Sequence, residues 1–433
     1  MTTAVHPYVE SLLSGSRELP RTAHAWLDER RGAALERANA LSVPTTRDEE
    51  WRFTDVTPLT RLQLRASEKP AVITADVAAA YSVPEAGAQL VFVDGLFRPE
   101  LSRTSEAPGV RIGALADALA SDSKSLEPYL ASIAAFERNV FAALNTAHLR
   151  DGAAVILQKG AVCHKPIHLL YLQTQADTVA YPRCVIVAAP GADCTVVEEY
   201  AGLTADAYFS NAVTEISIAP NARVRHVKIQ RESGRAFHIA TGAVRVAKDA
   251  SYNSQTITLG GRLSRYELNV FLDGEGASVQ IDGLALIGGR QLADTHTTID
   301  HARPSGRSVQ LHKTIVGDAA HAVFNGKIYV RPGAQLTDSS QQSRNLLLSD
   351  RATVDTKPQL EIFADDVKCA HGATVGQIDL EQLFYLKSRG LPDRMARNLL
   401  TYAFGAAVIE RIPVRSVVRR LEEAVMKQTG AAV

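Results

Sequence analysis

Hydrophobic and polar positions change their spacing twice along this chain of 433 residues. Up to about residue 65, apolar residues such as Trp26, Leu27 and Ala34 recur at helical spacing. From about 153 to 376, short runs rich in Val, Ile and Thr alternate with Gly, Asn, Asp and Pro, which is typical of strands and turns. Helical spacing returns after Gly376. The pattern predicts an N-terminal helical and mixed domain (1–150), a β core (151–376) and a C-terminal helical domain (377–433).

The stretch from 66 to 150 is mixed. LVFVDGLF (90–97) predicts a hairpin that turns at Asp94-Gly95. Further on, the apolar residues Ile133, Phe136, Val140, Phe141 and Leu144 have a spacing that predicts one amphipathic helix.

An internal repeat runs through the β core. A five-residue turn element reads KGAVC from Lys159, PGADC from Pro190, PNARV from Pro220, KDASY from Lys248, EGASV from Glu275, SGRSV from Ser305 and PGAQL from Pro332. Its copies are 27 to 31 residues apart, with no helical pattern between them. Such a period predicts a solenoid whose coils bury their apolar faces against each other. We therefore expect a mainly β fold, a right-handed parallel β-helix; a β-sandwich is the alternative, but it would not require a constant period.

The repeat also predicts which side chains stack inside the solenoid. The fifth position of the element holds Cys163, Cys194, Val224, Tyr252, Val279, Val309 and Leu336. An apolar column of this kind is expected to face inward, so Cys163 and Cys194 are interpreted as core residues, and so is Cys184 in its strand. The element returns as DRATV from Asp350 and HGATV from His371, which would place His371 in a surface turn.

Three helices are expected at the C-terminus. Asp379 and Gln382 can cap the first, and Pro392 can start the second, whose apolar stripe includes Leu399 and Phe404. The last follows Pro413, and it combines Val414, Val418 and Leu421 with Arg415, Arg419 and Arg420.

Composition narrows the function classes. The formal net charge is zero, so no overall field favours nucleic acid or an anionic membrane. No basic segment followed by an apolar core marks a signal peptide, and no apolar run approaches the roughly 18 residues of a membrane span. The four cysteines form no C-x-x-C pair, which fits free thiols in a reducing cytoplasm. No phosphate-binding loop of the G-x-x-x-x-G-K-[ST] type is present, so ATP hydrolysis would need a partner.

The segment LEIFADDVKCAHGATVGQID (360–379) carries the strongest chemical signal. Cys369 and His371 are two residues apart, a spacing that puts both side chains on one face of a strand. Thiolate and imidazole are suitable ligands for iron or zinc, but two ligands make half a site. For an isolated C-x-H pair, the ordinary interpretation is a core cysteine beside an exposed histidine.

The same segment carries a family resemblance. DDVKCAHGATVGQID (365–379), followed by LFYLKSRG (383–390), resembles the C-terminal signature of the SufB/SufD family of iron–sulfur cluster assembly proteins. EEWRFTD (49–55) resembles the N-terminal motif of that family. Ala370 departs from the Ser or Thr expected beside the ligand. The length and the lack of an N-terminal cysteine cluster favour the SufD branch.

The resemblance implies a fold and a role. The fold is a β-helix core flanked by helical domains, and the role is that of a non-catalytic subunit of a cytoplasmic SUF complex. Its partners would be a SufB-like paralogue and SufC-type ATPases, docked on the C-terminal helices, with no nucleic acid and no membrane; an isolated chain could form a homodimer. No cofactor would be stably bound to the lone chain. In the complex, a transient iron–sulfur cluster would form at the subunit interface with His371 and Cys369 as metal ligands.

Two alternatives differ from this interpretation. One is a SufB-type scaffold subunit. The other is a β-helix enzyme acting on polysaccharide, which would need clustered carboxylates on one strand face. Asp273, Glu275, Asp282, Asp294 and Asp300 lie in consecutive predicted coils and could supply them.

Overall fold

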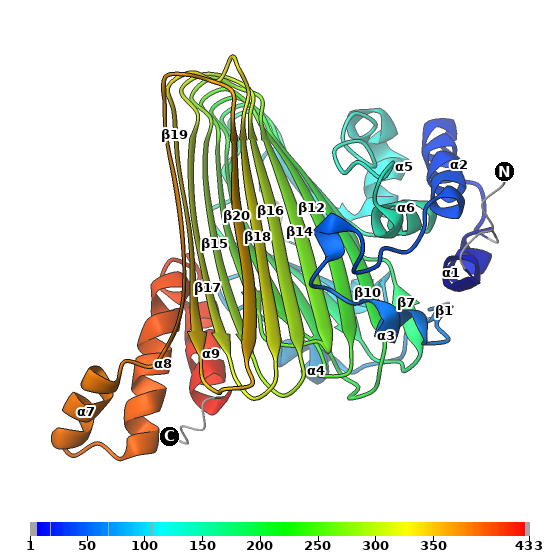
Figure 1. Ribbon diagram of the computed structural model, residues 1–433. Helices are drawn as coiled ribbons and strands as arrows, with labels where there is room; N and C mark the ends of the chain where they lie inside the picture. The colour runs from blue at the N-terminus through cyan, green and yellow to red at the C-terminus, as the bar shows by residue number, and fades with distance from the viewer. Residues whose placement is uncertain (1–6, 18, 68, 105–106, 429–433) are drawn as a thin grey trace.

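The computed structural model describes residues 7–17, 19–67, 69–104 and 107–428. Its core is a β-solenoid of about eight coils between residues 153 and 377, with helical regions before and after it. In Figure 1 the coils stack side by side, with the N-terminal helices toward one end of the stack and the last strands at the other. The expected parallel β-helix between helical regions is confirmed.

Each coil contributes strands to two facing parallel sheets. The first sheet contains β5 (Ala153–Leu157), β7 (Thr178–Ala180), β8 (Arg183–Ala188), β10 (Phe209–Ile218), β12 (Phe237–Val246), β14 (Leu263–Leu272), β16 (Leu292–His301), β18 (His321–Val330) and β20 (Thr353–Ile362). The second contains β6 (Ile167–Gln173), β9 (Asp193–Gly202), β11 (Arg223–Arg231), β13 (Ser251–Thr258), β15 (Ser278–Ile287), β17 (Arg307–Val316), β19 (Thr337–Leu347) and β21 (Val367–Gln377). Strand β4 (Val110–Ala114) extends the first sheet, whereas β2 (Ala88–Val93) and β3 (Leu96–Phe97) extend the second; the short β1 (Arg65–Ala66) pairs with β7. The expected hairpin is present as β2 and β3.

Helices cover the outer faces of both sheets. Before the solenoid come α1 (Pro7–Arg17), α2 (Ala25–Ala40), η1 (Glu49–Trp51), α3 (Thr57–Thr60), α4 (Ala75–Ala79), η2 (Pro99–Leu101), α5 (Leu115–Leu126) and α6 (Val140–Ala147). After it come α7 (Leu380–Ser388), α8 (Asp393–Ile409) and α9 (Arg415–Gln428). Residues of α1, α2 and α6 pack on the first sheet at Phe209 and Phe237, whereas α8 and α9 pack on the second at Ile257 and Leu284.

The expected helix from Ile133 to Leu144 is shorter in the structure. It begins at Val140, because the Asn139 side chain accepts hydrogen bonds from the next backbone N–H groups and so caps the helix there. The preceding backbone turns inward instead, and the amides of residues 131–134 all donate to the buried carboxylate of Glu215. Hydrophobic spacing alone predicts a helix that starts near residue 133. These backbone amides bind the Glu215 carboxylate from another part of the chain, and the helix starts later.

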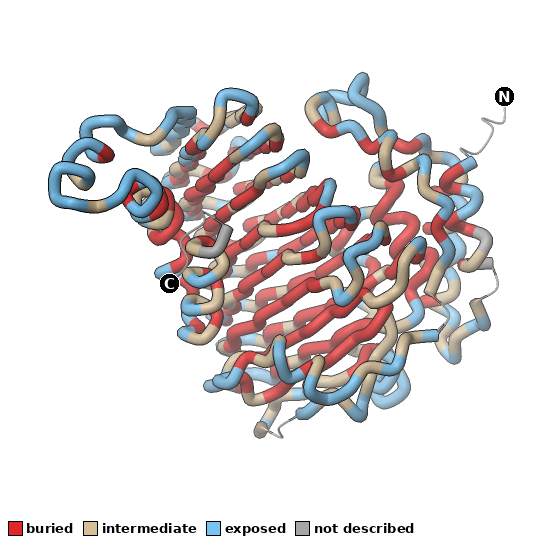
Figure 2. Tube along the Cα trace, turned by 90° about the horizontal axis from the view of Figure 1, so that it is seen from below, coloured by how far each residue is buried: buried red, intermediate tan, exposed pale blue. Residues whose placement is uncertain are grey.

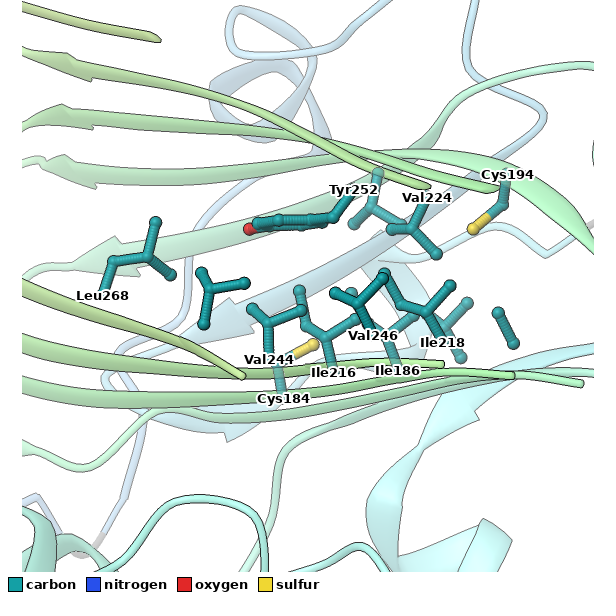
Figure 3. Packing of buried hydrophobic residues seen from close by; sticks show 14 of the residues in the cluster. Cys184, Ile186, Cys194, Ile216, Ile218, Val224, Val244, Val246, Tyr252 and Leu268 are labelled. Carbon is teal, nitrogen blue, oxygen red and sulfur yellow. The ribbon is translucent and has the colours of Figure 1, made fainter. Parts of the chain in front are cut away.

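Part of the inner core between the sheets of the first coils is an apolar cluster. Cys184, Cys194, Val224 and Tyr252 are packed there, as Figure 3 shows, and each is at most 1% exposed. Cys163, in contrast, is half-buried, and its thiol donates to the Lys165 carbonyl at 3.2 Å. The core interpretation is thus confirmed for Cys184 and Cys194 and holds only partly for Cys163.

The predicted stack is wrong in the later coils. The strand register pairs Val279 with Ser308, and Ser308 with Ser339. Val309 is therefore turned toward the outer face, where α8 covers the sheet, and Leu336 lies in a turn and is 60% exposed. GASVQI and GRSVQL are similar in sequence but are displaced by one residue in register, and a one-residue shift reverses the direction of every side chain.

Candidate functional site

Among the described residues, no strand pairs with the outer side of the last coil of the solenoid. Strands β20 and β21 each pair with one strand only, β18 and β19 respectively, so each has a free edge. Pro358 in β20 has no N–H, and Asp355, Lys357 and Glu361 add charge, features that discourage pairing of an edge strand. Strand β21 has no proline, and Lys368 is its one Lys, Arg, Asp or Glu. The two free edges therefore differ, and β21 is the one open to another strand.

Cys369 and His371 both lie in β21 and share its inward face. The register places Cys369 over Ser339 and His371 over Gln341, and both of those residues are buried between the sheets. His371 is exposed because no further coil covers it. The expectation of a surface turn is wrong: HGATV lies in mid-strand, and the similarity to the turn element was coincidental.

This pair is a partial donor set. Burial raises the pKa of the Cys369 thiol, and nearby Asp338 acts in the same direction, so the thiol is protonated at neutral pH. Within the described residues, no group of three or more His, Cys, Asp or Glu side chains is placed to hold a metal ion. A metal bound here would need ligands from another molecule.

The interior beneath the pair is polar. Under Cys369, the Ser339 hydroxyl shares a hydrogen bond with Ser308 at 2.6 Å, and Ser308 lies 2.9 Å from His301 Nε2. Under His371, Gln341 is fully buried, and neither atom of its amide has a hydrogen-bond partner in the described part of the chain. At the inward position that Cys194, Val224 and Tyr252 occupy in the first coils, the last coils thus carry Ser308 and Ser339.

A buried ionic cluster lies deeper in the solenoid, and sequence reasoning missed it. Glu198 is 2.9 Å from His226 and 3.4 Å from Lys228, whose ammonium lies 3.7 Å above the Tyr200 ring. Burial opposes ionisation of Glu198, but Lys228 and His226 outweigh it and lower the pKa of this carboxyl. Alternation along β9 and β11 could have indicated it, since Glu198 and Lys228 fall on the inward positions of their strands.

The Trp motif binds the N-terminal segment to four successive strands of the first sheet. The guanidinium carbon of Arg265 in β14 lies 3.8 Å from the centre of the Trp51 ring, and the Thr54 hydroxyl donates to Asp294 of β16 at 2.6 Å. Arg265 is also ion-paired with Asp294. In addition, Glu50 contacts His296 of β16 and Asn325 of β18, and Glu49 contacts Lys357 of β20. In the sequence, this motif indicated only a family resemblance. In the structure, its residues 49–54 cross the later coils and hold the N-terminal segment to them, and we call these residues the strap.

Most core histidines have polar partners, as expected of satisfied residues on strand faces. The close pairs are His168 with Glu199, His226 with Glu198, His238 with Glu232, His296 with Asp294, and His321 with Asp355. The five carboxylates of the polysaccharide alternative are also engaged, Asp273 with Arg245, Glu275 with Lys248, Asp282 with Arg411, Asp294 with Arg265 and Asp300 with Arg331. A glycosidase pair needs two carboxyl groups facing one bond, and these five have separate cationic partners.

The C-terminal helices carry five exposed large apolar side chains. They are Leu380, Phe384 and Tyr385 of α7 with Met395 and Leu399 of α8, each between 47% and 73% exposed, and we call this set the α7 patch. In Figure 2 the stacked strands are mostly buried, whereas the segment of α7, which projects beyond them on the left, is largely exposed.

Helix α9 does not present the mixed surface expected from its sequence. Val414 and Leu421 are buried against the second sheet, and Arg420 reaches the buried Glu199 at 2.8 Å. Its apolar stripe is used for packing within the chain.

No described helix is long and apolar enough to cross a bilayer. The sequence of this chain matches two known family models. The core domain of SufBD proteins, described as SUF system FeS cluster assembly, matches residues 171–404, and the SufBD N-terminal region matches residues 4–169.

Individual relatives agree with the family match. An iron–sulfur cluster assembly SufBD family protein of Synechocystis is 39% identical over 93% of this chain and 91% of its own length. The iron–sulfur cluster assembly protein SufD of Escherichia coli is 34% identical over 86% of this chain and 85% of its own length, and SufD of Bacillus subtilis is 28% identical over 92% of each. The chain belongs to the SufB/SufD family of iron–sulfur cluster assembly proteins.

Proposed function

We propose that this chain is a SufD-type accessory subunit that pairs with a SufB-like subunit through the open end of its solenoid. The observation that carries the proposal is the uncovered last coil, which presents Cys369 and His371 on its inward face beside the unprotected edge of β21. A partner strand added to this edge would cover the pair and supply the missing ligands. The nascent cluster, as cargo, would then be held between two subunits and released when they move apart. A cytoplasmic location belongs to the same proposal.

His371 is the stronger of the two proposed ligands. Its ring is exposed at the open end, whereas the Cys369 thiol is half-buried with a raised pKa. Metal binding requires a deprotonated thiol, which this environment disfavours. We therefore assign His371 the main role and Cys369 an auxiliary one.

The α7 patch is the proposed dock for the SufC-type ATPase. Its five large apolar side chains are exposed, whereas the turn after α8 and helix α9 are tied to the second sheet by Arg411–Asp282 at 2.7 Å and Arg420–Glu199 at 2.8 Å. A force applied at α7 would therefore reach the strands through two ion pairs and a packed core. Deleting residues 379–433 would expose the buried outer face of the second sheet, so point substitutions make the better test.

Two variants test the two surfaces separately. Ala373→Arg with Val375→Arg places positive charge on the inward face of β21 and should abolish co-purification with the SufB-like subunit while ATPase binding persists. Phe384→Ser with Leu399→Ser should do the reverse. Binding of the SufB-like subunit that survives the first double substitution would contradict the proposed interface. The isolated chain with the same substitutions, measured by analytical ultracentrifugation, shows whether a homodimer uses this edge.

A SufB-type role is the remaining alternative within the family. A stoichiometric cluster reconstituted on the purified chain alone would favour it, because the two donors found here do not make a complete site.

A further inference from the structure

Gln341 occupies an unusual position directly beneath His371. The two residues are register partners on neighbouring parallel strands and face the same interior. Adjacent strands lie about 4.8 Å apart, so a glutamine side chain can reach the imidazole of the next coil. Gly326 faces Gln341 across the interior, and a Cβ at that position would collide with the amide nitrogen. The absence of a side chain at Gly326 thus makes room for the Gln341 amide, which lies against this glycine.

The amide of Gln341 is buried and unused. Its side-chain oxygen and nitrogen have no hydrogen-bond partner among the described residues, and the residue is 0% exposed. An unsatisfied buried amide costs about 1–3 kcal/mol, so a core without another purpose would favour an apolar side chain here. The polar residues one coil deeper each have at least one partner: Ser308 shares a hydrogen bond with Ser339, and the Gln310 side-chain oxygen accepts from Thr297 at 2.9 Å, although the Gln310 amide nitrogen has no partner among the described residues.

We propose that Gln341 is a positioning residue for His371. In the assembled complex, its Oε1 turns toward β21 and accepts a hydrogen bond from the ring nitrogen of His371 that does not face the cargo. This bond fixes the tautomer and the ring orientation and makes the other nitrogen a better ligand. Metal-binding histidines usually donate their second N–H to such an acceptor. The inference rests on the proposed function of His371 and adds the group that orients it.

The test uses the complex of the full chain with its SufB-like and SufC-type partners, loaded with ferrous iron and sulfide. The readout is the pH at which cluster absorbance is lost during acid titration, because protons compete with metal for the imidazole. Loss of an outer-shell partner typically costs 10–100-fold in metal affinity. With one competing proton, Gln341→Met should raise the release midpoint by about one to two pH units. Thermal stability should be unchanged or higher, because an unsatisfied amide is removed.

Two further variants separate positioning from packing. Gln310→Met is the matched control, since Gln310 lies in the same inward column one coil deeper and cannot reach His371; its midpoint should equal that of the wild type. Gln341→Glu retains an acceptor oxygen and should restore a midpoint at or below the wild-type value.

The outcomes distinguish the two proposals. An unchanged midpoint in Gln341→Met, an equal shift in Gln310→Met, or failure of Gln341→Glu to restore the midpoint would overturn the positioning role while the function of His371 stands. An unchanged midpoint in His371→Ala would overturn the proposed function itself, and this inference with it.

Discussion

At the scale of single residues, exposure has different causes at different places. His371 is exposed because the solenoid ends above it, whereas Leu336 is exposed because it lies in a turn. A side chain that is exposed because the solenoid ends can be covered by a partner, and at the same position in the preceding coil the side chain is buried. Substituting such a residue should therefore affect assembly more than folding.

His371→Ala tests this directly. Exposed substitutions usually change stability by no more than about 0.5 kcal/mol, so the thermal melt should be nearly unchanged. Cluster-dependent enzyme activity in cells should fall strongly, because a ligand of the cargo is lost. His164→Ala, which removes an exposed histidine from an early coil, should leave activity at the wild-type level. Normal activity in His371→Ala would contradict the assignment.

The cysteines of the first coils should behave in the opposite way. Cys194 is fully buried, so Cys194→Ala leaves a small cavity and should cost roughly 1 kcal/mol. Cys163→Ala should cost less, because that thiol is half-buried. Neither substitution should reduce cluster assembly per folded complex. Urea denaturation of the two variants beside the wild type measures the difference, and an assembly defect in folded Cys163→Ala would show that chemistry occurs in the early coils.

The sequence was sufficient to predict which of these side chains share a face of a strand, but not whether that face points into the core. The Cys–His spacing was sufficient to place both side chains on one face of a strand, because strand periodicity is local. The direction of that face was not predicted, because it depends on register with the neighbouring coil. Ser308 and Val309 illustrate this: the repeat favoured the valine as the core residue, and the hydrogen-bond register selected the serine. Buried partners such as Gln341 have no local signal at all.

At the scale of elements, the inward faces of the later strands combine burial with titratable groups. His312 of β17 is buried against Phe324 of β18, with ring centroids 4.5 Å apart. Burial lowers the pKa of His312 to about 3. The pKa values of His148 and His301 are likewise lowered by burial, each to about 4. These histidines remain neutral in the folded protein at pH values where the unfolded chain binds protons.

Stability should therefore fall as the pH decreases below about 6.5. The unfolded chain gains protons between that pH and the folded pKa, so each such histidine favours unfolding in this window. His312→Leu should make the dependence shallower, by on the order of 1–2 kcal/mol between pH 6.5 and 5. Urea titrations of both proteins at the two pH values measure the change. An equal slope for variant and wild type would mean that His312 is protonated in the folded state.

The α7 patch is the other testable element. Phe384→Ser should weaken ATPase binding at least tenfold, because a largely exposed aromatic side chain in an apolar patch is a typical anchor of an interface. The thermal melt should be unchanged. Val72→Ser is the matched control, since Val72 is 90% exposed and lies outside the patch. Calorimetric titration with the ATPase gives both affinities, and equal affinities would place the dock elsewhere.

At the scale of the whole molecule, the strap of residues 49–54 connects the N-terminal region with the last coil. Its contacts with β14, β16, β18 and β20 span the part of the solenoid that ends at His371. The central anion is Asp294. Burial opposes its ionisation, but Arg265 and His296 outweigh burial and lower the pKa of this carboxyl.

Asp294→Ala should cost about 3–5 kcal/mol, because it leaves the buried Arg265 without its counter-charge. Glu49→Ala breaks a strap contact of the same kind with Lys357, but Glu49 is exposed, and the cost should be within about 1 kcal/mol. Chemical denaturation compares the two variants, and hydrogen exchange of residues 49–54 reports whether the strap has detached. Equal costs for the two substitutions would show that burial does not determine the strength of this strap.

The free edge of β21 also bears on how the cell must supply this protein. A parallel sheet that ends without a cap is a template for any extended chain, and another copy of the same protein is the most abundant candidate when it is overproduced. Synthesis of this chain in excess over the proposed SufB-like partner should thus yield self-association or degradation rather than a reserve of free chain. Matched production of the two subunits would then be a requirement of the fold.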